Sequence, residues 1–255
     1  MKSFLAVLLL VISTGFVFCR SYYIDYLDGT DDNDGLSPVS PLKNFTAIQN
    51  VLVPGDSVLF RGLAQYEKSL ELHNFGADDS PLVITTYGSS KAIISAGNGY
   101  GLYMTNCRNI IIDNLIFSGS GRLSGNTNNG VIIEDCQDIY LNKLDITGFQ
   151  HSGLLLQGAC KDIEVTRIHA YNNGFTGIHV YGKYPDKYQC KNIYIGHCKA
   201  KNNPGDPTIL DNHSGNGIIV GACDSILIEY CEALENGWDM PRKGNGPVGI
   251  WAWHA

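Results

Sequence analysis

The segment ACKDIEVTRIHA, residues 159–170, decides the fold because four other segments of the chain repeat its pattern. They are NCRNIIIDNLIF (106–117), DCQDIYLNKLDI (135–146), QCKNIYIGHCKA (189–200) and ACDSILIEYCEA (222–233). All five share Cys-x-(Asn/Asp/Ser)-Ile-x-(Ile/Leu/Val), and successive cysteines lie 29, 24, 30 and 33 residues apart. A repeat of variable period is typical of a solenoid whose insertions enter one loop.

Within each repeat, apolar and polar residues alternate over short segments between a glycine and an asparagine. A period of two is typical of β-strands, and these segments are too short for helices. Parallel strands need crossover connections, which a coiling chain supplies by winding. The sequence therefore predicts an all-β fold, a right-handed parallel β-helix with three short strands per coil. We expect a signal peptide at residues 1–19, an N-terminal cap with the first strands at 20–90, and β-helix coils at 91–255.

The repeated cysteines occupy one register position, and this predicts that their thiols stack inside the coils. A buried thiol behaves as a small apolar side chain, so such a stack can be part of a core. A disulfide within one coil, Cys190 with Cys198 or Cys223 with Cys231, is the alternative.

A ladder of asparagine side chains is also predicted. Its members, Asn173, Asn203 and Asn236, each lie thirteen residues after one of the last three repeat cysteines. An asparagine amide both donates and accepts hydrogen bonds. Each side chain in such a column can therefore bond to the backbone and to the side chain of the next. We expect this ladder to hold a turn of the coil.

The N-terminus predicts export. Residues 1–19 combine Lys2, an apolar run and a small residue, Cys19, before an expected cleavage site. The apolar run is too short to span a bilayer, so no membrane association is expected after cleavage. The formal net charge of -7 does not suit nucleic acid, which is bound by basic surfaces. We expect a secreted or periplasmic monomer.

Three segments before the coils carry a resemblance to a known family: GTDDNDGLSP (29–38), PLK (41–43) and PGDSVLF (54–60). Together they resemble the N-terminal cap of secreted, pectate-lyase-like right-handed β-helix proteins, which include bacterial polysaccharide lyases. The resemblance covers residues 22–255 and implies this fold, export and a polysaccharide partner. Around these segments we expect a strand at 22–26, a polar turn at 30–37, a short helix at 45–51 and a strand at 57–60.

The alternation also predicts which side chains face outward. We take the glycines that open the strands as equivalent, so the residues two and four positions later point out. In the last three coils these outward pairs are His179 and Tyr181, Ile219 and Gly221, and Trp251 and Trp253. The two aromatic pairs would stand about 10 Å apart, with a hollow at Gly221 between them. Aromatic rings suit the CH-rich face of a sugar, although the segment 236–246 is an alternative cover for them.

Polar side chains from neighbouring turns and loops complete the predicted site. We assign substrate binding to His179, Tyr181, Trp251, Trp253, Trp238, Arg242 and Asn216. Lys243 and His213 are the candidate catalytic bases, and His151 borders the same strip. A polysaccharide lyase needs such a base to remove the proton α to a uronate carboxylate, and a cation to neutralise that carboxylate.

Calcium is the cofactor that the resemblance suggests, but its ligands are not evident. Asp-Gly pairs occur only at Asp28 and Asp34, in the cap, where a hydrogen-bonded turn is favoured over a calcium loop. No spacing gathers Asp206, Asp211 and Asp239 into a cluster, so we assign no metal ligand within this sequence. The sequence stops within a predicted strand, and we expect further coils, with any calcium ligands, beyond residue 255.

The predicted function is cleavage of an acidic glycan by β-elimination, as a polysaccharide lyase. Three alternatives stay open. A glycoside hydrolase needs two carboxylates, and Glu134 with Asp135 is the only acid pair on a coil strand. A uronate epimerase would share the proton abstraction, and a non-catalytic polysaccharide-binding or surface adhesion protein would use the aromatic strip for binding alone.

Overall fold

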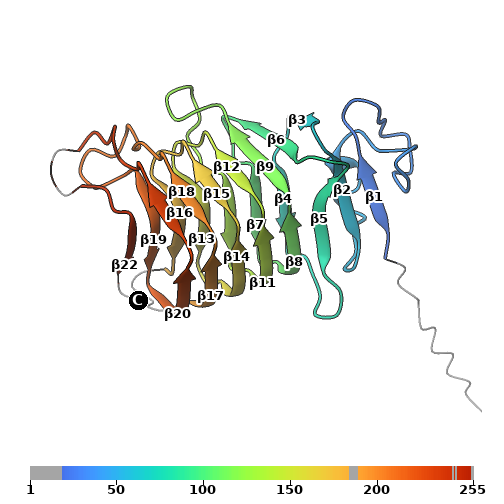
Figure 1. Ribbon diagram of the computed structural model, residues 1–255. Coiled ribbons are helices and arrows are strands. Elements are labelled where there is room, and N and C mark those ends of the chain that lie inside the picture. The colour runs from blue at the N-terminus through green and yellow to red at the C-terminus, as the bar shows by residue number, and fades with distance from the viewer. Residues whose placement is uncertain (1–18, 184–188, 243, 245, 254–255) are drawn as a thin grey trace, which may run out of the picture.

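The computed structural model describes residues 19–183, 189–242, 244 and 246–253, and these residues wind into a parallel β-helix (Figure 1). Three parallel sheets run along one axis, and each full coil adds one strand to each sheet. The predicted fold class is confirmed. Because each coil contacts only the coils beside it, the outer surface of each sheet becomes a straight row of side chains.

From β2 onward, each sheet takes every third strand along the chain, and β1 pairs with β2 at the N-terminal end. The first sheet holds β1 (Ser21–Ile24), β2 (Ser57–Arg61), β5 (Leu82–Tyr87), β8 (Arg108–Asp113), β11 (Gln137–Asn142), β14 (Lys161–Thr166), β17 (Cys190–Gly196) and β20 (Cys223–Glu229). The second holds β3 (Gln65–Tyr66), β6 (Ala92–Gly97), β9 (Leu115–Gly119), β12 (Asp145–Thr147), β15 (His169–Tyr171), β18 (Lys199–Lys201) and β21 (Glu232–Leu234). The third holds β4 (Leu70–His73), β7 (Leu102–Thr105), β10 (Val131–Glu134), β13 (Ser152–Gln157), β16 (Thr176–Tyr181), β19 (Asn216–Gly221) and β22 (Ile250–Trp253).

The core consists of columns of identical or similar side chains. The isoleucine that all five repeats share forms one column across five neighbouring strands of the first sheet. Its members, paired in register, are Ile110, Ile139, Ile163, Ile193 and Ile226. The first four of these are at most 2% exposed. Full burial of one such side chain contributes about 1.5–3 kcal/mol, so each added coil extends the core by a similar amount.

The repeat cysteines are buried beside this column, as predicted. Their positions are Cys107, Cys136, Cys160, Cys190 and Cys223. Cys190 pairs in register with Cys223, and the backbone N–H of Cys107 donates to Sγ of Cys136 at 3.4 Å. All eight cysteines of the chain are free thiols, so the alternative of a disulfide within one coil is not realised.

The third position of the repeat motif has a backbone reason. Asn109, Asp138, Asp162, Asn192 and Ser225 all have positive φ, between 53° and 61°. Asparagine and aspartate tolerate this left-handed region better than other residues with a side chain. The motif therefore selects Asn, Asp or Ser because the first strand of each coil bends at this residue.

The predicted asparagine ladder is present. Asn203 Oδ1 accepts the backbone N–H of Asn173 at 3.0 Å, and Asn236 Oδ1 accepts that of Asn203 at 3.0 Å. Each Nδ2 also reaches the next amide, at 3.3 Å and 2.9 Å. The ladder continues one coil further than predicted, because Asn173 Oδ1 accepts the backbone N–H of Phe149 at 3.2 Å.

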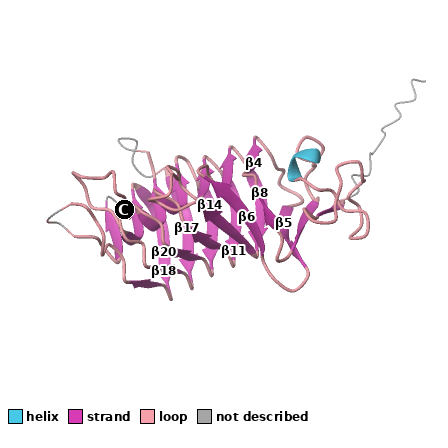
Figure 2. Ribbon diagram, turned by 90° about the horizontal axis from the view of Figure 1, so that it is seen from above, coloured by secondary structure: helices cyan, strands magenta, loops and turns pink. Residues whose placement is uncertain are grey.

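The cap differs from its prediction in one element. In place of a helix at 45–51 there is a 3-10 turn, η1 (Phe45–Ala47), drawn in cyan in Figure 2. The side chain of Asn44, just before it, bonds to Asp31 and leaves the helix without a side-chain cap. Asp31 also accepts the backbone N–H groups of Lys43 and Asn44, so the acidic segment forms the hydrogen-bonded turn that was favoured.

Candidate functional site

The outer face of the third sheet carries two parallel rows of side chains. The first row is Glu71, Tyr103, Ile132, Leu155, His179, Ile219 and Trp251. The second row is His73, Thr105, Glu134, Gln157, Tyr181, Gly221 and Trp253. The predicted equivalence of the coils and the outward position of the aromatic pairs are therefore confirmed.

At the C-terminal end of these rows lies a pocket of about 320 Å³, here named the aromatic pocket. It is lined by Phe175, His179, Tyr181, Asn212, His213, Ile219, Trp251 and Trp253. The described residues of the segment 236–246 are not among its lining, and Trp251 is 41% exposed. Rings, an imidazole and an amide thus surround a space that solvent can reach.

The two aromatic pairs lie closer together than predicted. The Trp253 ring lies over Gly221, where an added Cβ would meet it at 2.1 Å. It stacks on Tyr181 with 5.8 Å between ring centroids and 29° between ring planes. The prediction of a hollow at Gly221 was wrong, because the indole of Trp253 is long enough to extend over this position, which has no side chain. The result is a continuous aromatic surface.

His179 lies at the centre of this surface and is largely buried. Its ring is 5.4 Å from that of Phe175 and 5.8 Å from that of Tyr181, between centroids. Burial lowers the pKa of His179 to about 4, because it penalises the charged form. His179 is therefore a neutral ring near pH 7 and can stack or donate one hydrogen bond.

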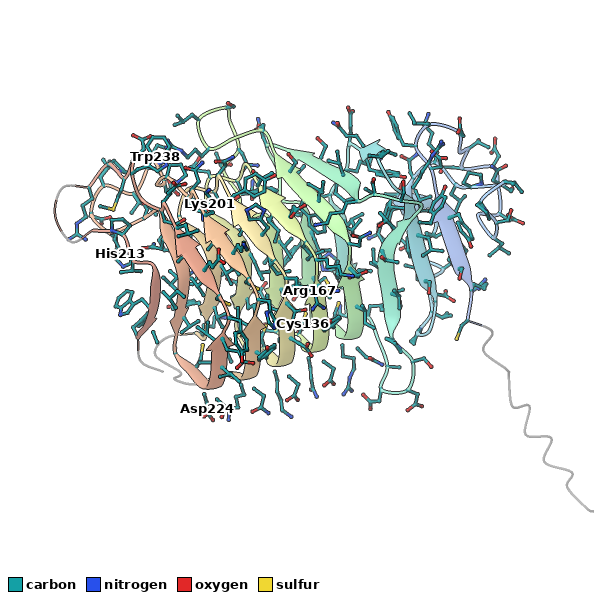
Figure 3. The ribbon with its side chains drawn as sticks, in the orientation of Figure 1. Cys136, Arg167, Lys201, His213, Asp224 and Trp238 are labelled. Carbon is teal, nitrogen blue, oxygen red and sulfur yellow. The ribbon has the colours of Figure 1, made fainter. Side chains whose placement is uncertain are left out.

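His213 lies at the edge of the pocket with its tautomer fixed. Its Nδ1 is 2.8 Å from Oδ1 of Asn216, and its ring meets Trp251 edge-on at 5.3 Å (Figure 3 marks its place). Asn216 Oδ1 also accepts the backbone N–H of Val248, while its Nδ2 donates to the carbonyl of Phe175. These backbone partners fix which amide atom is the oxygen, so Nδ1 of His213 must donate and Nε2 carries the lone pair.

Asn216 is fully buried, and all of the contacts just described are within the protein. Sequence reasoning placed it among the residues that touch substrate. The structure gives it a different position, behind His213. Its amide orients the imidazole and joins β19 to the segment that leads into β22.

The loop residues of the predicted site are not gathered at the pocket. Trp238 lines a different groove and donates its Nε1–H to Asn202 Oδ1 at 2.7 Å. Arg242 is half-buried in the segment between β21 and β22 and is not in the lining of the aromatic pocket. Lys243 lies outside the described residues.

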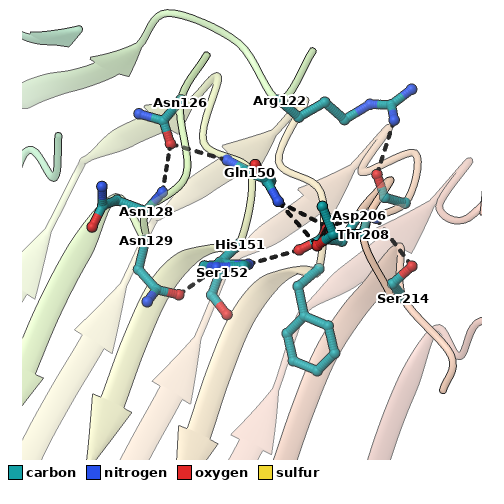
Figure 4. Close-up of polar contacts among 12 residues, drawn as sticks. Arg122, Asn126, Asn128, Asn129, Gln150, His151, Ser152, Asp206, Thr208 and Ser214 are labelled. Carbon is teal, nitrogen blue, oxygen red and sulfur yellow. Dashed lines mark hydrogen bonds and ion pairs between the residues drawn. The ribbon is translucent and has the colours of Figure 1, made fainter. Parts of the chain in front are cut away.

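A second histidine on the same sheet edge pairs with a buried carboxylate (Figure 4). His151 precedes β13, and its Nδ1 is 2.6 Å from Oδ2 of Asp206. Its ring is 39% exposed, and its Nε2 has no hydrogen-bond partner among the residues that the structure describes. The backbone carbonyl of His151 accepts the N–H of Phe175 in the next coil, so this pair borders the aromatic pocket.

Asp206 is 0% exposed and comes from the long loop that follows β18. Its Oδ1 accepts from Gln150 Nε2 at 3.1 Å and from the backbone N–H and hydroxyl of Thr208 at 2.9 Å and 2.7 Å. Burial alone would raise the pKa of Asp206, but these bonds and the one from His151 outweigh it and lower the pKa. Asp206 therefore stays ionised and holds His151 with Nε2 toward solvent.

The other half of the outer face is acidic. Glu71 accepts a hydrogen bond from the Tyr100 hydroxyl. Glu134 accepts one from Tyr103 at 2.5 Å and one from Gln157 at 2.9 Å. The bond to Glu134, with burial, raises the pKa of Tyr103 to about 12.

The acid pair found in the sequence is divided between two environments. Glu134 lies on the outer face, whereas Asp135 has φ of 52° and accepts the backbone N–H of Ala159 at 2.7 Å. Glu134 ends β10 and Asp135 turns away after it, so the two carboxylates cannot act on one bond. This pair therefore gives no support to a hydrolase.

The described residues contain no group of three or more His, Cys, Asp or Glu side chains that could hold a metal ion. They do not fit the calcium site that the resemblance implies, and no catalytic step is assigned to calcium. The expectation of ligands beyond residue 255 stays a prediction.

The sequence model described as "Right handed beta helix region" matches residues 83–206 and 129–252, which together exceed half of the chain. The chain belongs to this family. This right-handed β-helix protein has no match among curated proteins. In the part of the chain that the structure describes, no helix is long and apolar enough to cross a membrane.

Solved structures share the fold of this β-helix protein at low sequence identity. A GH136 lacto-N-biosidase from Eubacterium ramulus is 20% identical, with a TM-score of 0.70, over 92% of this chain and 49% of its own. A rhamnogalacturonan lyase is 14% identical, with a TM-score of 0.72, over 92% and 62%. A pectate lyase, Pel9A, is 17% identical, with a TM-score of 0.64, over 92% and 69%. This chain therefore spans about half the length of the lacto-N-biosidase chain.

Proposed function

We propose that this protein is a secreted polysaccharide lyase that binds an acidic glycan along the outer face of the third sheet. The observation that carries the proposal is the fixed tautomer of His213 beside the aromatic pocket. A neutral imidazole with a free lone pair on Nε2 is the form that a general base requires. Lyases among the structures of the same fold support the reaction class.

The reaction that we propose is a β-elimination. Nε2 of His213 takes the proton from C5 of a uronate, and the electron pair of that C–H bond forms the C4–C5 double bond. The C4–O bond breaks, and its electron pair goes to the leaving oxygen, which takes up a proton from solvent. The rings of His179, Tyr181 and Trp251 would hold the sugar faces. Lys243, the other candidate base, lies outside the described residues and stays a prediction, as does the assignment of Arg242 to substrate binding.

The test is an assay on the purified protein with polygalacturonate, rhamnogalacturonan and alginate, each with and without added calcium. Ultraviolet absorbance of unsaturated uronates is followed together with new reducing ends. We expect both to rise with one of these glycans. The matched control variant is His197→Gln, because His197 is exposed and stacks on Tyr230, in the turn after β17. Retention of full lyase activity by His213→Gln would contradict the assignment of the base.

A glycoside hydrolase is the second candidate, because the lacto-N-biosidase shares the fold and two carboxylates occupy the outer face. Glu71 and Glu134 lie on strands separated by one strand, so their backbones are about 10 Å apart or more. Inverting hydrolases hold their carboxyl groups about 6.5–9.5 Å apart. The backbone spacing of Glu71 and Glu134 alone does not bring the two carboxyl groups into that range, so the hydrolase stands second. New reducing ends without ultraviolet absorbance would favour it over the lyase, and binding without cleavage would favour an adhesion protein.

A further inference from the structure

A second groove runs along the turn that follows the strands of the second sheet. It has a volume of about 420 Å³ and shares no lining residue with the aromatic pocket. Its polar lining comes from successive coils, and Trp238 stands at its C-terminal end. The side chains that matter here are Ser118, Ser120, Ser124, Thr147, Asn172 and Trp238. Because these residues follow strands of different coils, the groove is elongated along the solenoid axis.

Trp238 is held rigidly although it is exposed. Its Nε1–H donates to Asn202 Oδ1 at 2.7 Å, and Asn202 in turn donates to Asn172 Oδ1 at 2.8 Å. The backbone is fixed on both sides, since the N–H of Gly237 and of Asp239 donate to carbonyls of the preceding coil at 2.8 Å and 2.9 Å. The side chain is nevertheless 66% exposed. A fixed, solvent-facing ring loses little conformational entropy when a ligand stacks on it.

Among the described residues, the lining of the groove carries no free charge. Its one ionisable side chain, Arg122, is 10% exposed and pairs with Asp239, and it also donates to the carbonyl of Gly205 at 3.1 Å. The other lining groups are hydroxyls, an amide, backbone, a proline and apolar side chains. This surface differs from the outer face of the third sheet, which holds two glutamates and two histidines.

The floor of the groove depends on close backbone approach. A Cβ added to Gly119 would lie 2.4 Å from the carbonyl oxygen of Gly148, and Gly148 has φ of +81°. Only glycine suits both positions, because a side chain there would clash or strain the backbone. Because Gly119 and Gly148 have no side chains, the space above the turn stays open for a ligand.

We propose that this groove is a second carbohydrate-binding site, specific for neutral sugar units, with Trp238 as its stacking platform. Hydroxyls and amides that both donate and accept match the hydroxyls of a sugar, and the indole face matches its CH groups. The lack of free charge favours uncharged sugars over uronates. The proposal stands independently of the lyase reaction, since it uses none of the residues of the aromatic pocket.

The test uses tryptophan fluorescence and calorimetry with two neutral probes, tetrasaccharides of β-linked galactose and β-linked glucose, and with tetragalacturonate as the acidic probe. The chain has three tryptophans, so Trp251→Phe with Trp253→Phe leaves Trp238 as the only indole. We expect saturable quenching or a blue shift of Trp238 emission with at least one neutral probe. Trp238→Ala should weaken that binding at least about tenfold, or about 1.4 kcal/mol.

The control is Trp251→Ala, which should leave neutral binding unchanged within about twofold while it weakens binding of tetragalacturonate. Trp238 is exposed, so its removal should not unfold the protein, and an unchanged thermal midpoint checks this. Equal affinity of Trp238→Ala and the parent chain for both neutral probes would overturn the proposal. Tighter binding of tetragalacturonate than of either neutral probe at Trp238 would overturn the assigned ligand class.

Discussion

Two histidines on one edge of the third sheet have the same tautomer for different reasons. His213 is fixed by the neutral amide of Asn216, and His151 by the buried carboxylate of Asp206. Both partners orient the imidazole by accepting from Nδ1–H, but only the carboxylate places a negative charge beside the ring. The comparison teaches that a neutral amide can orient an imidazole within its own sheet edge, while the contact with a carboxylate also ties the histidine to a loop from another part of the chain.

The largest expected effect is on catalysis. His213→Gln should lower lyase activity by about 10²–10⁴-fold, because general-base catalysis contributes about that much. His151→Gln should lower it by less than about tenfold, since its main contact is with the loop after β18. Initial rates from unsaturated uronate formation measure both. The opposite order would move the base to His151 and reverse the comparison.

The next effect is on stability. Asp206→Ala removes the acceptor of four hydrogen bonds from a fully buried site, and it should lower the free energy of unfolding by about 3–5 kcal/mol. Asn216→Ala removes a neutral buried amide and should cost about 1–3 kcal/mol. Guanidinium denaturation followed by circular dichroism measures the two values. Equal costs would show that the charge of Asp206 adds nothing to the loop contact.

The smallest effect comes from a third histidine, His179, for which burial rather than a polar partner sets the charge. Its pKa is lowered from 6.5 to about 4, so the unfolded chain binds a proton at a pH where the folded chain does not. Stability is therefore full above about pH 6.5 and falls as the pH drops toward about 4, by about 3 kcal/mol. Urea denaturation across this range should show the slope, and His179→Phe should flatten it. His197→Phe is the matched control, and a flattening equal to that of His179→Phe would refute the assignment.

The coil could be predicted from the sequence because its rules are local. The thiol register, the asparagine ladder and the outward position of Trp251 all follow from alternation and from a repeat of 24 to 33 residues. The family resemblance predicted the same architecture, and the match to the family confirms it.

The contacts of the site could not be predicted in the same way. Asp206 reaches His151 across 55 residues of sequence, from a loop that belongs to no repeat. Trp238 was assigned to substrate binding at the aromatic strip, yet its contact with Asn202 holds it in a different groove. The lean of Trp253 over Gly221 depends on the shape of one side chain. Alternation gives the direction of a side chain from its strand, but not where a long ring ends or where a loop returns.

The column of free thiols has a practical consequence. Cys19 is exposed, Cys231 is half-buried, and the other six cysteines are buried in five successive coils. Because Cys19 leaves with the predicted signal peptide, an alkylating reagent should label Cys231 first and each interior sulfur only when its own coil separates from its neighbours. Mass spectrometry of the labelled peptides would then map, coil by coil, where the solenoid begins to come apart.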